Sequence, residues 1–111
     1  MTQPVRSGIA HDPLDVAQIC ASAQDARCGA VVSFVGVVRN HDAGQRIVAI
    51  DYSAHPQAPV ILQELAESAV HARGVHRVEA WHRVGHLMVG EAAMVVVVAA
   101  EHRAAAFATT S

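Results

Sequence analysis

The sequence predicts an α+β domain in which helices flank a mixed, mainly antiparallel sheet. Segments of helical and strand periodicity follow one another in the order helix, strand, strand, helix, strand, strand, helix. The chain has 111 residues, which is the size of one domain. Hydrophobic residues make up 52% and charged residues 16%, which is enough apolar material for a core. We therefore expect residues 1–111 to form a single domain.

The first helix is predicted over residues 13–26. Asp12 and Pro13 resemble a helix start, with an acidic N-cap followed by proline at the first helical position. The apolar residues that follow recur at three-four spacing and form one stripe: Val16, Ile19, Cys20 and Ala23. One face of this helix should therefore pack on the sheet.

The first strand is predicted over residues 29–38, GAVVSFVGVV. The segment is rich in β-branched residues and nearly continuously apolar, so we expect a strand that is buried on both faces. Gly36 inside it predicts a bulge or a close approach of a ligand or another backbone. Ser33 is expected to be a core hydroxyl bonded to backbone.

A polar loop is predicted over residues 39–46, and a second strand over 47–55. Pro56 and Pro59 then open a helix that is expected to end at Gly74, acting as its C-cap. Six apolar residues of this helix follow three-four spacing, as in a half-buried helix: Ile61, Leu62, Leu65, Ala66, Ala69 and Val70.

The third strand is predicted over residues 75–85, where apolar and polar residues alternate. A turn at residues 89–91 leads into a long buried strand over 92–100. The segment from residue 101 onward has the alanine content of a helix and reaches Ser111 after about two turns. Because so short a helix needs packing partners, we expect the natural protein to continue beyond Ser111.

Composition argues against several classes of function. The net charge of −2 argues against a nucleic-acid binder, which would carry a basic stripe. The apolar run 92–100 is far shorter than the roughly 20 residues of a membrane helix, and no basic segment with a long apolar one opens the chain. We expect a cytoplasmic protein without a membrane partner. Cys20 and Cys28 are interpreted as small buried thiols, because their spacing fits neither a CxxC pair nor a disulfide framework.

All eight basic residues are arginines, and lysine is absent. No mechanism that needs a lysine amine can be carried by these residues. Arginine stays charged at any working pH and binds phosphate or carboxylate through its planar fork. Anion recognition therefore remains possible.

The first candidate site is Arg39, with Asn40 and His41 beside it. One interpretation is a solvated surface turn, because loops are generally polar. The other is an anion site, because Arg39 comes directly after an apolar strand that would fix its direction. Both interpretations stay open on spacing alone.

The second candidate site is His102 with Arg103, after the most apolar strand and at a predicted helix start. Unpaired amides and the positive end of the helix dipole favour an anion there. The alternative is that both side chains only cover the sheet edge.

The third candidate is His82 with His86, which have the i, i+4 spacing of metal ligands on a helix. Here the pair spans a strand and a turn at Gly85, and no thiolate or carboxylate completes a ligand set, so we predict structural histidines and no metal. The sequence also lacks a nucleophile elbow, a P-loop and a dinucleotide fingerprint.

Three motifs occur in order along residues 29–107: F-x-G-x-V-R at 34–39, H-R-x-G-x-L-x-x-G-[DE] at 82–91 and H-R-x-x-A-F at 102–107. Together they resemble the large, catalytic subunit of molybdopterin synthase. The resemblance implies an α/β-hammerhead-type fold and a cytoplasmic sulfurtransferase of molybdenum cofactor biosynthesis. Such an enzyme converts precursor Z, a cyclic pyranopterin monophosphate, to the molybdopterin dithiolene.

The resemblance also implies partners and roles. Sulfur would arrive as a thiocarboxylate on the C-terminus of a small ubiquitin-like subunit, and two large subunits would form the homodimer core of a heterotetramer. No cofactor is implied. Val37, Val38 and Arg39 match the pterin- and phosphate-binding strand end. His102 and Arg103 match a second substrate-binding pair, which in this family can act across the dimer interface.

The chain departs from the family pattern in two places. The family's catalytic lysines lie in a segment beyond Ser111, so no catalytic residue is assigned here. His86 stands where the family more often has an acidic residue. Two other functions therefore stay open: a non-catalytic dimeric scaffold that binds the small subunit or a phosphorylated pterin, and a histidine-rich metal-binding protein.

Overall fold

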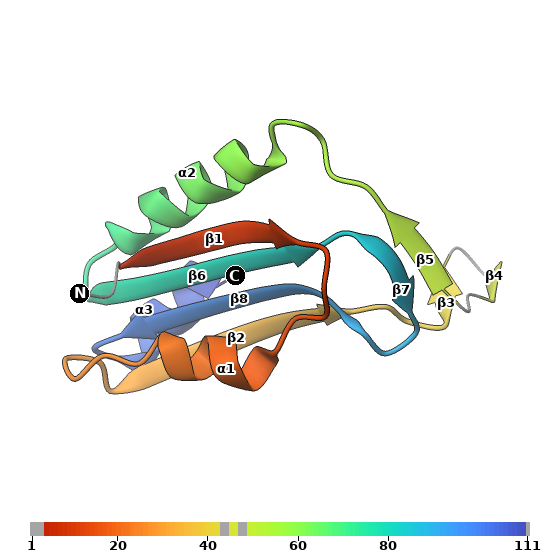
Figure 1. Cartoon of the computed structure of the whole chain (residues 1–111). Coiled ribbons are helices and arrows are strands. Elements are labelled where there is room, and N and C mark those ends of the chain that lie inside the picture. Colours follow the sequence, from red (N-terminus) through yellow and green to blue (C-terminus); the bar gives the residue numbers. More distant parts are fainter. Residues whose placement is uncertain (1–3, 43–44, 47–48, 111) are drawn as a thin grey trace.

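A four-stranded sheet forms the centre of the molecule (Figure 1). The computed structural model describes residues 4–42, 45–46 and 49–110. The strands lie in the order β1-β6-β8-β2, with bounds Val5–Ala10 for β1, Val75–Arg83 for β6, Ala92–Ala100 for β8 and Ala30–Val37 for β2. β1 runs parallel to β6, and the other two pairings are antiparallel. The predicted α+β class with a mixed, mainly antiparallel sheet is confirmed.

Strand β1 is absent from the sequence prediction. Its sequence, VRSGIA, contains a glycine and two polar residues, so it shows no apolar alternation. It becomes a strand by pairing with β6, in a register that places Gly8 beside Trp81. A Cβ on Gly8 would lie 2.7 Å from the Trp81 ring, so the glycine leaves room for the indole.

Helices α2 (Ala58–Val70) and α3 (Arg103–Thr110) cover one face of the sheet, α2 over β1 and β6 and α3 over β8 and β2. Their buried alanines, Ala66 and Ala106, join one core cluster with the valines of β6 and β8. Small side chains at these two points let the helices approach the sheet closely. Among the described residues, no helix is long and apolar enough to span a membrane.

Helix α1 (Val16–Ser22) covers the opposite face, where Leu14 and Ile19 pack with Val95 and Val97 of β8. It is shorter than the predicted helix over 13–26, and Asp12 is not its N-cap. The cap is Asp15, whose Oδ1 accepts the Gln18 amide at 3.1 Å. The next acidic residue along the chain therefore takes the capping role.

The prediction that the strand over 29–38 is buried on both faces is wrong. β2 is an edge strand, and Val31, Ser33, Phe34 and Val37 are exposed. The apolar run indicated a central strand, although a run of this kind also fits an edge that is covered by something else. The bulge predicted at Gly36 is confirmed as a register shift between Gly36 and Val37.

The predicted helix over 56–74 ends earlier than expected. α2 stops at Val70 with His71 as its C-cap, and Gly74 instead makes the turn into β6 at a φ of 82°. The turn predicted at residues 89–91 is confirmed, with Gly90 at a φ of 92°. Both glycines have backbone conformations that L side chains rarely adopt.

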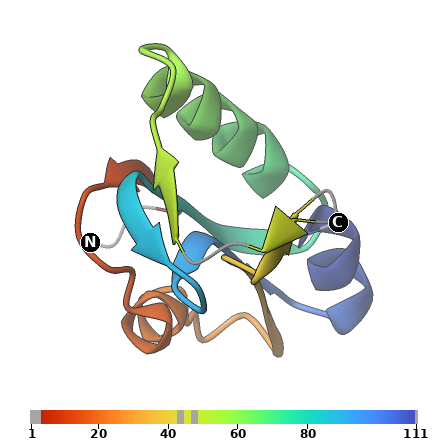
Figure 2. The ribbon, with the colours of Figure 1, turned by 90° about the vertical axis from the view of Figure 1, so that its right-hand side faces the viewer.

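Two small sheets lie beyond the end of the main sheet where β2 and β6 finish (Figure 2). β5 (Ala49–Tyr52) pairs with β7 (Gly85–Met88), so the predicted strand over 47–55 is shorter, and its residues 47–48 lie outside the described part. β3 (His41–Asp42) pairs with β4 (Gln45–Arg46) inside the predicted loop 39–46, of which residues 43–44 lie outside the description.

Candidate functional site

Arg39 follows the end of β2, and its place in the chain is set by backbone hydrogen bonds on the preceding residue. The Val38 amide donates to the Glu91 carbonyl at 3.1 Å, and the Gly90 amide donates to the Val38 carbonyl at 2.8 Å. Val38 is 3% exposed, whereas Arg39 is exposed. Val38 is thus buried and held by two backbone hydrogen bonds, and the exposed Arg39 follows it directly. This is the arrangement expected of a cation whose backbone is fixed at a strand end.

The turn that holds Val38 has its own internal bonds. Glu91 accepts the Met88 amide at 2.8 Å through Oε1 and forms an ion pair with Arg83 through Oε2. Nη2 of Arg83 also donates to the His86 carbonyl at 3.4 Å. The Met88 amide, and then the Arg83 guanidinium, lower the pKa of Glu91. The carboxylate is therefore stabilised in its charged form.

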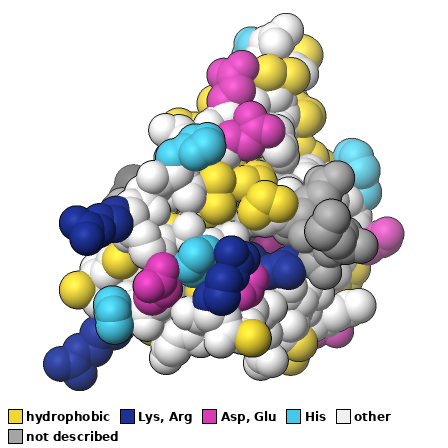
Figure 3. Space-filling model, turned by 90° about the vertical axis from the view of Figure 1, so that its left-hand side faces the viewer, with side chains coloured by type: hydrophobic (Ala, Val, Ile, Leu, Met, Phe, Trp, Pro, Cys, Tyr) yellow, Lys and Arg dark blue, Asp and Glu magenta, His cyan; other side chains and the backbone are white. Residues whose placement is uncertain are grey.

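His102 and Arg103 lie where β8 passes into α3. The Glu101 amide donates to the Gly74 carbonyl at 2.8 Å, and the Gly29 amide donates to the Glu101 carbonyl at 3.3 Å. His102 precedes α3, and its carbonyl accepts the Ala106 amide at 3.3 Å. Both side chains are exposed. Side chains of histidine and of both charges gather on this end of the molecule (Figure 3).

The two candidate sites lie at opposite ends of the same strand pair. β2 and β8 are antiparallel, with Ala30 beside Ala100 at one end and Val37 beside Ala92 at the other. At about 3.3 Å per residue, the stretch from Ala30 to Val37 alone spans roughly 23 Å, and Arg39 and His102 lie beyond its two ends. One copy of the chain therefore does not bring Arg39 together with His102 and Arg103.

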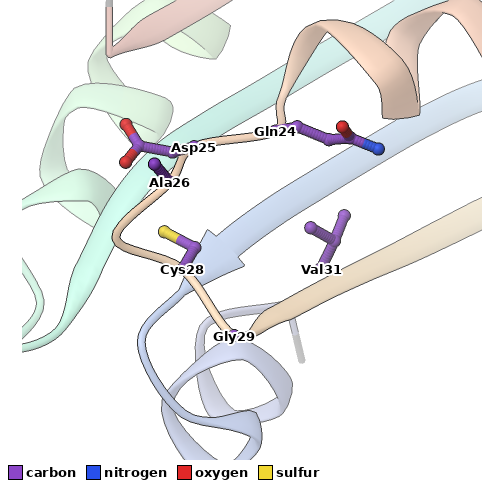
Figure 4. A pocket seen from close by; sticks show the side chains of 6 residues that line it. All are labelled: Gln24, Asp25, Ala26, Cys28, Gly29 and Val31. Carbon is purple, nitrogen blue, oxygen red and sulfur yellow. The ribbon is translucent and has the colours of Figure 1, made fainter.

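A pocket of about 420 Å³ opens beside the start of β2 (Figure 4). It is lined by Gln24, Asp25, Ala26, Cys28, Gly29 and Val31. Asp25 accepts hydrogen bonds from the Arg27 side chain at 2.9 Å and lies 3.5 Å from Nε of Arg77. The Arg27 hydrogen bonds hold the pKa of Asp25 well below its usual range. Burial, and then the Asp25 charge, raise the pKa of the Cys28 thiol.

The histidines that were considered as metal ligands have other partners. Nδ1 of His82 lies 2.8 Å from the Arg83 carbonyl, and its ring packs edge-on against Tyr52. Nδ1 of His86 lies 2.8 Å from Oδ1 of Asp51 across the β5–β7 pair. Their rings thus interact with different groups, and no cluster of three ligating side chains occurs in the described part of the chain.

Sequence reasoning did not find the Asp25 and Cys28 pocket or the Arg83–Glu91 ion pair. No sequence motif marks the pocket, whose walls come from the connection between α1 and β2 and from the start of β2. The sequence singled out both members of the ion pair, since Arg83 and Glu91 belong to the motif at 82–91. Their separation by eight residues across two strands gave no sign that they meet.

Comparisons with known proteins agree on one family. The family model described as MoaE protein matches residues 9–111. The molybdopterin synthase catalytic subunit 1 of Mycobacterium tuberculosis is 37% identical over 103 residues, which is 89% of this chain and 68% of that protein. The chain spans 62–68% of the length of three bacterial relatives and half or less of the length of the animal relatives that it matches.

Solved structures show the same fold. The molybdopterin synthase structure from Staphylococcus aureus superposes with a TM-score of 0.83 at 26% identity, covering 91% of this chain and 74% of that one. A complex of subunits 1 and 2 of the molybdopterin-converting factor from Helicobacter pylori gives a TM-score of 0.73 at 20% identity, covering 97% and 73%. The match over residues 9–111 and these relatives establish that the chain belongs to the MoaE protein family, whose curated members here are called molybdopterin synthase catalytic subunits.

Proposed function

We propose that this chain acts as the large subunit of a molybdopterin synthase. It would receive sulfur from the thiocarboxylated C-terminus of a small ubiquitin-like subunit and pass it to precursor Z, forming the dithiolene. The observation that carries the proposal is the family match over residues 9–111 with relatives called molybdopterin synthase catalytic subunit. The small-subunit partner is supported by the Helicobacter pylori neighbour, which is a complex of subunits 1 and 2.

Substrate binding is assigned to the two strand-end sites. Arg39, with the backbone of Val37 and Val38, would bind the anionic cyclic phosphate and the pterin edge. His102 and Arg103 would supply further donors. Precursor Z carries negative charge, and fixed donors neutralise charge without reorganising during the reaction. Lysine does not occur among the 111 residues, so we assign substrate binding to them and no step that needs a lysine amine.

A homodimer would complete the site. Among the described strands, β2 lies at an edge of the main sheet and carries exposed apolar side chains, which makes it suited to pairing with a second copy. Arg39 lies five residues after Phe34, and Gly29 lies five residues before it. Antiparallel pairing of two β2 strands about a two-fold axis at Phe34 would therefore place Arg39 of one copy beside Gly29 of the other. Since the Gly29 amide bonds to Glu101, His102 of the second copy would be close to Arg39.

The reaction itself is the first test. The protein, the thiocarboxylated small subunit and precursor Z would be mixed, and the dithiolene product would be measured after conversion to a fluorescent pterin. We expect product with the wild type and roughly 5- to 150-fold less with Arg39→Ala, because one hydrogen-bonded ion pair contributes roughly 1–3 kcal/mol. Wild-type protein in its natural length that forms no product would refute the proposed reaction.

Mixing two variants tests whether the site is shared between copies. Arg39→Ala and His102→Ala homodimers should each bind precursor Z poorly. A mixed dimer has one site that lacks both groups and one site that is intact. Random assembly should thus restore about a quarter of the wild-type binding capacity, since half of the dimers are mixed. Titration calorimetry would measure this, and no recovery after confirmed subunit exchange would contradict a shared site.

The second candidate function is a non-catalytic dimeric scaffold that binds the small subunit or a phosphorylated pterin. It needs only the binding groups proposed above, all of which occur among the 111 residues. It predicts that precursor Z and the small subunit bind while no dithiolene forms. The reaction test therefore separates the two functions directly.

A further inference from the structure

The motif at residues 82–91, HRVGHLMVGE, contributes no residue to the proposed substrate site. Its residues Arg83 and Glu91 nevertheless form an ion pair in which the guanidinium is buried. Arg83 is 8% exposed, although a guanidinium is rarely taken out of water without a specific partner. Glu91 uses one carboxylate oxygen for Arg83 and the other for the Met88 amide. The pair thus joins the end of β6 to the turn between β7 and β8.

That turn is also what holds the end of β2. The carbonyl of Glu91 accepts the Val38 amide, and the amide of Gly90 donates to the Val38 carbonyl. Both backbone groups of the residue before Arg39 are therefore bonded to the turn that the ion pair closes. The bulge after Gly36 shifts the pairing with β8 at this place, so Val37 pairs with Ala92 and Val38 depends on the turn.

We propose that Arg83 and Glu91 are positioning residues for Arg39, because their ion pair fixes the turn at Met88–Glu91 to which the end of β2 is bonded. The inference rests on the proposed function, since Arg39 needs a fixed direction only if it binds the anionic substrate. Neither residue touches substrate in this account. They act by restricting the backbone from which the Arg39 guanidinium extends, so that less conformational freedom is lost on binding.

The first measurement needs no substrate. Amide hydrogen exchange would be followed in the wild type and in Glu91→Gln, which keeps the shape and an acceptor for the Met88 amide but removes the charge that pairs with Arg83. We expect the amides of Val38 and Gly90 to lose about tenfold in protection, while the amides in the middle of β8 change far less. Equal loss at all these amides, or no loss at Val38 and Gly90, would overturn the proposal.

The second measurement is a double-mutant cycle on the binding of precursor Z. Glu91→Gln alone should weaken binding about tenfold. In an Arg39→Ala background, the same substitution should have almost no further effect, because the group that it positions is gone. Additive losses in the double variant would show that Glu91 does not act through Arg39. Arg83→Met should behave as Glu91→Gln does.

A control variant separates positioning from general loss of stability. Leu62 lies in α2, which contacts mainly β1 and β6, and it packs against the core. Leu62→Ala should lower the melting temperature at least as much as Glu91→Gln while leaving the affinity for precursor Z within about twofold. A parallel loss of affinity in Leu62→Ala would overturn the positioning role. If wild-type protein binds no precursor Z, the proposed function fails, and the exchange experiment still supports or overturns the fixing of Val38.

Discussion

The two ends of the β2–β8 pair are built in different ways. At the Arg39 end, Leu87 is fully buried, Val38 and Val84 are buried, and both backbone groups of Val38 are bonded to the turn at residues 90–91. At the His102 end, β8 finishes in Ala99 and Ala100, backbone hydrogen bonds join Glu101 to Gly74 and Gly29, and Asp25 pairs with the exposed Arg27.

The two ends hold their cationic side chains, Arg39 and Arg103, in different ways. At the Arg39 end, large apolar side chains and backbone bonds restrict one strand end, and a single guanidinium follows it. At the His102 end, small side chains let α3 approach the sheet, and the chain enters this helix at Arg103, directly after His102. We expect the first end to be sensitive to packing and the second to charge.

The largest expected effect is that of Leu87→Ala. Leu87 is fully buried, so truncation removes its packing and leaves a cavity, at a cost of about 2–5 kcal/mol in the free energy of unfolding. Urea unfolding would measure this loss. Val31→Ala, at the exposed start of β2, should change stability by less than about 0.5 kcal/mol. Equal costs for the two variants would contradict a packed Arg39 end.

Gly90 and Gly74 allow the same substitution to be made at both ends of the β2–β8 pair. Gly90 bonds to Val38 at one end and Gly74 bonds to Glu101 at the other, both with positive φ and both with open space where a Cβ would lie. Gly90→Ala and Gly74→Ala should therefore each cost about 1–2 kcal/mol of stability through backbone strain alone. Only Gly90→Ala should also weaken the binding contributed by Arg39, as measured by comparing it with Gly90→Ala/Arg39→Ala. Unequal stability losses would show that the two turns differ in more than position.

Acid should weaken both ends. The pKa values of Asp25 and Glu91 are lowered from ordinary values of 3.8 and 4.5, so each carboxylate stabilises the fold above those values. Their contributions are lost as the pH falls through the lower pKa values of the folded state. Melting temperatures between pH 7 and pH 2.5 should therefore be flat at first and then fall. Asp25→Asn and Glu91→Gln should each fall less steeply than wild type, and an unchanged slope in either would contradict its ion pair.

The smallest effect concerns Cys28. Because burial raises the pKa of its thiol from 9.0, iodoacetamide should alkylate it several-fold more slowly at pH 8 than it alkylates a free cysteine. Cys20→Ser leaves Cys28 as the only thiol of the chain, so mass spectrometry would follow one reaction. A rate equal to that of free cysteine would place the thiol in solvent.

Much of the fold could be predicted from local sequence. The helix over Ala58–Val70 and the long strand over Ala92–Ala100 follow from apolar periodicity and from β-branched residues. Strand β1 could not be predicted, because VRSGIA becomes a strand only through its partner β6. The same limit explains β2: its apolar run predicted a strand, whereas burial depends on which strands become its neighbours.

The candidate site, like the fold, could be predicted only in part from the sequence. The family motifs, the arginine-only cation set and the two strand-end positions, Arg39 and His102 with Arg103, are visible in the sequence alone. The three-dimensional structure was needed to show that these positions lie at opposite ends of an antiparallel pair, and that Arg83 and Glu91 form an ion pair at the turn that holds Val38. The physical reason is that motifs record residue types along the chain, whereas strand direction and register determine which of those residues meet in space.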